Sequence, residues 1–297
     1  MYKRQAQARA TLEGATGLGF DPVRVEAELQ LGIVLSRRGR PKDAEPLLAR
    51  AYWGASDLDY PAVGAEAAIE LAWQVGYLQG RHADGIEWAR HYESMARREG
   101  RDPGPHVAMV LGPIHFDAGE FAAARPYLEQ QLAAALEDGD DTHTAAIARM
   151  NLANLLLELD ENERAADEFQ RAQELLEREF PDGHPDLALT LINRADLELE
   201  RDRALAQTLL ERGVAMSIAI NGELHPATGL GLSKLGALRQ REHPAEAVAT
   251  LERAVRAYAT GAPAERLQAE HELARRSGHG GAGGGGRVHA RWNRLSV

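Results

Sequence analysis

One segment of the chain, residues 142–260, repeats itself at intervals of about forty residues. Ala165, Phe169 and Ala172 are spaced four and three residues apart, and the same spacing returns twice, each time 41 residues later. The returning positions are Ala206, Leu210, Gly213, Ala247, Leu251 and Ala254. A period near forty residues indicates an array of helical hairpins, in which each unit buries its apolar face against the next. The repeat therefore predicts an all-α solenoid.

Signals for the starts of helices extend this array toward the N-terminus. Asp21-Pro22 is a helix start because Asp accepts hydrogen bonds from the first turn and Pro fits the first helical position. His184-Pro185 and His225-Pro226 introduce two later units at the same 41-residue spacing. Residues 60–100 fit less well, and we expect one extra residue in their loop. The pattern as a whole predicts about six antiparallel helix hairpins in a right-handed superhelix.

The spacing of small and large residues resembles the tetratricopeptide repeat. In that family the first helix carries a large residue next to a small one, and a bulky residue follows three positions later. The second helix then carries a small, a large and a small residue. The matching residues of the first unit are Leu31, Gly32, Leu35, Ala44, Leu48 and Ala51. Small residues of this kind stand where two helices touch.

The length of the unit and two short motifs sharpen the resemblance. The units recur at 41 or 42 residues, the lead is His184-Pro185-Asp186, and the core is Asn151-Leu152-Ala153-Asn154. These features are similar to the kinesin-light-chain type of repeat. Residues 72–82 also resemble the repeat region that follows the kinase domain in many large bacterial serine/threonine protein kinases. The first resemblance implies a groove that binds protein segments, and the second implies a regulatory region.

The ends of the chain differ from the array. Residues 1–20 are expected to hold either a partial helix of a truncated repeat, so that the chain would be a piece of something longer, or a solitary capping helix. Residues 21–276 are expected to form the solenoid, with a helix at 264–276 covering its open end. Residues 277–297 contain a long glycine run, which loses much entropy on ordering, and we expect a disordered tail.

Composition narrows the function classes. The net charge of −11 argues against nucleic acid or anionic lipid as a partner, because both attract basic surfaces. The absence of cysteine fits a reducing, cytoplasmic location, and no apolar run is long enough to span a bilayer. Aromatic residues make up only 5% of the chain, which suits closely stacked helices.

Residues that could carry out catalysis do not form any known pattern. The glycine run lacks the Gly-Lys-Ser/Thr ending of a phosphate loop, and the Gly-rich, His-Arg-Asp and Asp-Phe-Gly signatures of kinases are absent. We interpret His184 and His225 as helix caps rather than metal ligands, and His271-Glu272 lacks the second His of a metalloprotease motif. The chain is therefore expected to be no enzyme and to need no cofactor or metal.

The remaining candidate site is the groove lined by the first helices of the hairpins. We expect exposed side chains there at Met150, Asn151, Asn154, Asn193, Trp73 and Phe116. Asn amides offer both a donor and an acceptor, so they can pair with the backbone of an extended peptide. The alternative is that these amides order the hairpin stack. Trp53 and Trp88 fall on second helices and are expected in the core between units.

Two hypotheses follow. The first is a scaffold that binds a protein or peptide in its groove, with a basic segment favoured by the acidic surface and without nucleic acid or membrane as partner. The second is a sensory or regulatory repeat region of a bacterial serine/threonine protein kinase whose catalytic domain is not in this chain.

Overall fold

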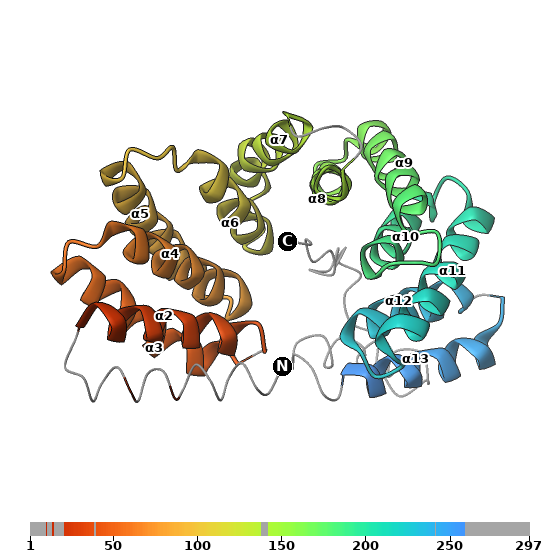
Figure 1. Cartoon of the computed structure of the whole chain (residues 1–297). Coiled ribbons are helices and arrows are strands. Elements are labelled where there is room, and N and C mark those ends of the chain that lie inside the picture. The colour runs from red at the N-terminus through yellow and green to blue at the C-terminus, as the bar shows by residue number, and fades with distance from the viewer. Residues whose placement is uncertain are drawn as a thin grey trace. The chain divides into compact units, whose positions relative to one another are not determined.

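The structure is a computed structural model that describes most of the repeat region (Figure 1). The described residues are 21–38, 40–137, 142–240 and 242–258, with the single residues Ala10 and Gly14. Apart from these two residues, the expected partial helix at 1–20, the capping helix at 264–276 and the tail at 277–297 lie outside them.

The described residues form helices and contain no strand, which confirms the all-α solenoid of helical hairpins. The hairpins are α2 (Asp21–Ser36) with α3 (Pro41–Asp57), α4 (Pro61–Leu71) and η1 (Ala72–Leu78) with α5 (His82–Arg98), α6 (Gly104–Asp117) with α7 (Phe121–Glu137), α8 (His143–Glu158) with α9 (Asn162–Glu179), α10 (Pro185–Glu198) with α11 (Arg203–Asn221), and α12 (Pro226–Arg239) with α13 (Pro244–Tyr258).

The chain divides into two compact units, Met1–Ala134 and Ala135–Val297. In the first unit α3 packs on α4 and α5 packs on α6, so each hairpin is joined to the next. In the second unit α9 packs on α10 and α11 packs on α12 in the same way, while the first helices α8, α10 and α12 are also neighbours. Each unit thus has the nearest-neighbour packing of a solenoid.

Small residues set the distance between the two helices of a hairpin. Ala44, Leu48 and Ala51 of α3 are fully buried. A Cβ added to Gly32 of α2 would lie 2.6 Å from Cδ2 of Leu48, closer than real side chains approach. The small-large-small pattern is therefore the contact between the helices, as the sequence predicts.

The second hairpin contains an irregular helix. Its first helix begins as α4 and continues as η1, a π-helical segment. We expected the extra residue of this unit in the loop, and that expectation is wrong: the irregularity lies within the helix, as is usual for π-helical insertions. A Cβ added to Gly85 of α5 would lie 2.3 Å from Cα of Gly76, so the two backbones touch at this point.

Candidate functional site

In the second unit the predicted groove residues lie on two neighbouring first helices, and they are buried. Met150, Asn154 and Asn193 have no exposed surface, and Asn151 is 1% exposed. The prediction that these positions are exposed is wrong. Met150 belongs to a small apolar core with Phe169 of α9. The hairpin pattern identifies the first-helix positions but not how closely successive first helices cover them.

The amides of Asn154 and Asn193 are the unusual feature of this region. Neither the nitrogen nor the oxygen of either side-chain amide has a hydrogen-bond partner among the described residues. Asn151 differs from them, because it has an interaction partner. A buried polar group without a partner costs about 1–3 kcal/mol, and such groups in a native protein often mark a function.

Charged side chains on the first helices α8, α10 and α12 are paired. Arg149 of α8 donates to Glu168 of α9 at 2.6 Å, and Arg194 of α10 donates to Gln173 of α9 at 2.7 Å. Lys234 of α12, which stands 41 residues after Asn193, forms an ion pair with Asp196 of α10. These pairs fix the first helices relative to their neighbours.

In the first unit Trp73 and Phe116 have different environments. Trp73 in η1 is half-buried and stacks on Tyr77, with ring centroids 4.3 Å apart. Phe116 is 8% exposed and packs at the end of α6 against Phe121. Its predicted exposure is therefore wrong, because the hairpin turn folds Phe121 back onto it. Trp53, expected in the core, is instead 55% exposed.

Two carboxylates precede Trp73 and Tyr77 on the same helix. Glu66 and Glu70 lie one turn apart in α4, and Trp73 and Tyr77 stack on each other in η1, where the helix continues. Burial raises the pKa of Glu70, the Arg37 guanidinium opposes this, and the Glu66 carboxylate raises the pKa further. We call these four residues the acidic-aromatic face.

Gln74 of η1 is a residue that sequence reasoning missed. Both atoms of its side-chain amide are buried, and they lack a hydrogen-bond partner within the described part of the chain. An ordinary α-helical register gives no signal for it, because the direction of this side chain depends on the π-helical turn.

The histidines that lead two repeats are helix caps. Nδ1 of His184 accepts a hydrogen bond from the backbone N–H of Asp186 at 3.2 Å, and Nδ1 of His225 accepts one from Ala227 at 3.2 Å. The prediction that both residues cap their helices is confirmed.

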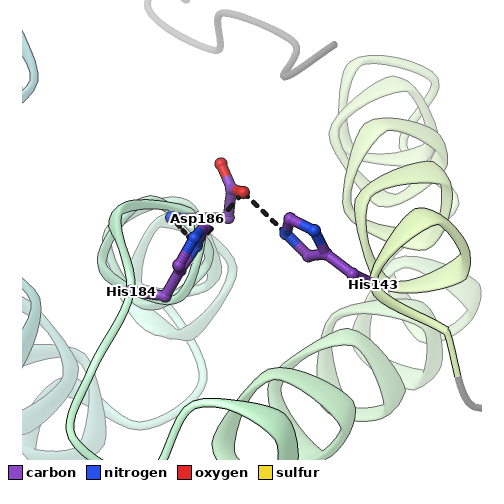
Figure 2. A group of neighbouring side chains, drawn as sticks. All are labelled: His143, His184 and Asp186. Atoms are coloured by element: carbon purple, nitrogen blue, oxygen red, sulfur yellow. Dashed lines mark hydrogen bonds and ion pairs between the residues drawn. The ribbon is translucent and has the colours of Figure 1, made fainter.

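A third histidine joins the first of these caps (Figure 2). His143 is the first residue of α8, and its Nε2 lies 2.9 Å from Oδ2 of Asp186, which is also 3.3 Å from Nδ1 of His184. Sequence reasoning missed His143. Its signal was the repeat itself, because His143, His184 and His225 follow one another at 41-residue intervals.

Comparison with known proteins bears on the fold. Residues 146–186, which cover most of α8, all of α9 and the start of α10, match the family model of the tetratricopeptide repeat. Residues 146–186 therefore contain a tetratricopeptide repeat. All-helical arrays of this family typically serve binding rather than catalysis.

Among solved structures, the crystal structure of BtubC (BKLC) from P. vanneervenii is similar to this chain. The match has 20% sequence identity and a TM-score of 0.35, and it covers 95% of this chain and 94% of the other. No curated protein matches the chain. None of the described helices is both long and apolar enough to cross a membrane.

Proposed function

We propose that this chain is an interaction scaffold of the tetratricopeptide-repeat kind, which binds an extended segment of a protein along its first helices. The observation that carries the proposal is the pair of buried, unpartnered amides of Asn154 and Asn193. A peptide backbone alternates N–H donors and C=O acceptors, and an Asn amide can pair with both. Binding would then satisfy polar groups that the described residues leave unsatisfied.

The burial of these amides has a consequence for the kinetics. Neither Asn154 nor Asn193 has exposed surface, so a ligand reaches them only after a local opening of the first-helix layer. Binding that requires such a change associates more slowly than rigid docking, which proceeds at about 10⁵–10⁷ M⁻¹s⁻¹. We therefore expect the peptide to associate slowly, and we expect its hydrogen bonds to the two amides to contribute to its affinity.

A basic segment is the ligand chemistry that the first unit favours. On the acidic-aromatic face, Glu66 and Glu70 supply negative charge, and the stacked rings of Trp73 and Tyr77 supply a surface for a guanidinium or ammonium group. The net charge of −11 adds a long-range attraction for such a segment. We propose that nucleic acid and membrane are not partners and that the protein works in the cytoplasm.

Affinity measurements on variants test the proposal. A library of extended basic peptides is screened by fluorescence anisotropy, and the best binders are titrated against Asn154→Ala and Asn193→Ala. Each variant should weaken binding by about 1–3 kcal/mol without lowering thermal stability, because the removed amide had no partner in the free chain. Asn162→Ala, at the exposed start of α9, is the matched control. Unchanged affinity with a loss of stability would assign the asparagines to the hairpin stack.

The kinase-associated alternative stays a prediction. Its test is the coding sequence around this chain: a kinase domain in the same reading frame supports it, and its absence removes it. The resemblance to kinesin-light-chain repeats also stays a prediction.

A further inference from the structure

We propose that His143, His184 and Asp186 form a binding site for a divalent transition-metal ion of the zinc class, which joins the first helices α8 and α10. The inference goes beyond the proposed function and does not depend on it. The three side chains come from the starts of two consecutive first helices and point toward one another (Figure 2). One ligand atom from each lies within 4.8 Å of the others.

The distances between the donor atoms fit a small ion. A tetrahedral zinc ion lies about 2.0–2.2 Å from nitrogen and carboxylate ligands, which holds neighbouring ligand atoms about 3.3 Å apart. Oδ2 of Asp186 lies 2.9 Å from Nε2 of His143 and 3.3 Å from Nδ1 of His184. The three donor atoms lie within 4.8 Å of one another, so side-chain movements of about an ångström would bring all of them to the spacing of zinc ligands.

The donor types select the class of metal. Two imidazoles and one carboxylate suit zinc and its neighbours in the first transition row, whereas magnesium and calcium prefer all-oxygen ligands. The three side chains are all partly exposed. Water can therefore reach the site and complete the coordination that three protein ligands leave open.

Phe180 supports the site from the end of α9. Its ring stacks on His184 with centroids 4.1 Å apart and meets the edge of His143 at 5.2 Å. These contacts hold both imidazoles in the orientation that brings them to Asp186. An apolar contact of this kind also limits solvent on one side of the ligands, which strengthens metal binding.

The next repeat shows that capping alone does not need this arrangement. His225 caps α12 through the same Nδ1 contact as His184, but Ala227 takes the place of Asp186 and offers no carboxylate. A metal at Nδ1 of His184 would replace the cap that this atom provides to Asp186. The ion would also take the place of the direct contact between His143 and Asp186. Because it would bind both residues, it would still connect α8 to α10.

Zinc titration of matched variants tests the proposal. Untagged, chelator-treated protein is titrated with zinc chloride in a calorimeter as wild type, His143→Gln, Asp186→Asn and His225→Gln. Because the chain has eleven histidines, the comparison is between variants rather than with an absolute count. Wild type and His225→Gln should each bind one equivalent of zinc at this site. His143→Gln and Asp186→Asn should lose this equivalent or bind it about tenfold or more weakly.

Two further measurements make the result decisive. Cobalt substituted for zinc should give the visible absorption of a four- or five-coordinate ion in wild type and His225→Gln but not in the other two variants. Circular dichroism of the metal-free proteins shows whether each variant folds. If Asp186→Asn does not fold, His143→Gln still tests the site, because it leaves the cap at His184 intact. Equal zinc binding by all four proteins, or no binding by wild type at sub-millimolar zinc, would overturn the proposal.

Discussion

Gly85 of α5 lies directly against the backbone of Gly76 in η1: a Cβ on Gly85 would stand 2.3 Å from Cα of Gly76 and 3.0 Å from the carbonyl oxygen of Ala72. The neighbouring atoms belong to the backbone, so no side chain can rotate away to make room. The two helices of the second hairpin therefore approach as closely as helices can, at the place where the first of them becomes π-helical.

Gly85→Ala should destabilise the protein, because overpacking a tight contact costs about 1–3 kcal/mol. The gain of about 1 kcal/mol in helix propensity offsets only part of this. Chemical denaturation measures the change. Gly64→Ala is the matched control, because its nearest neighbour is the flexible end of Met95 at 3.4 Å, an ordinary contact. A Gly85→Ala protein as stable as the control would contradict the close approach.

Glu70→Gln should raise the melting temperature at neutral pH. The pKa of Glu70 is raised in the folded chain above its usual value of 4.5, chiefly by burial. The folded state therefore favours the protonated form, and this contribution to stability is present below pH 4.5 and is lost as the pH rises through the folded pKa. The neutral glutamine avoids that loss. Thermal melts of both proteins from acid to neutral pH should converge at the acid end.

Glu211→Gln provides a control of opposite sign. Hydrogen bonds from Gln207 and Arg239 lower the pKa of Glu211, so its contribution is present above pH 4.5 and is lost as the pH falls. This variant should melt at or slightly below the wild-type temperature at neutral pH, with a small effect because the group is near the surface. A higher melting temperature for both variants would show that the Glu70 result reflects only the reduced net charge.

Some of this structure could be predicted from the sequence and some could not. The 41-residue period predicts the hairpins, because small residues such as Gly32 must recur where two helices touch. The His-Pro pairs predict the helix caps. The burial of Met150 depends in part on contacts with the next hairpin, because Leu197 of α10 belongs to the same apolar core. Those contacts follow from how successive units are rotated, which the pattern within one unit does not encode.

The missed histidine has a different cause. His143 stands at the same place in its repeat as His184, but no proline follows it, so the local His-Pro signal is absent. Only the alignment of whole repeats would have placed it beside Asp186. Gln74 could not have been found in this way, because a π-helical turn shifts the direction of every side chain within it.

Trp73→Ala should weaken binding of peptides that contain Arg or Lys by about 1 kcal/mol, or roughly fivefold, because a cation over an exposed aromatic ring contributes that amount. The loss should be smaller for peptides in which the basic residues are replaced by Gln. Trp53→Ala is the matched control, because Trp53 is exposed on the second helix α3. If the two variants lose the same amount of peptide affinity, the acidic-aromatic face is not part of the binding surface.

The most direct test of the peptide-binding proposal is the NMR signal of the side-chain amides of Asn154 and Asn193 during titration with the best basic peptide. Both amides lack partners among the described residues, so new hydrogen bonds to a peptide backbone should move their NH₂ resonances downfield in proportion to saturation, while the exposed amide of Asn162 stays in place. Resonances of Asn154 and Asn193 that remain unchanged at full saturation would contradict the account.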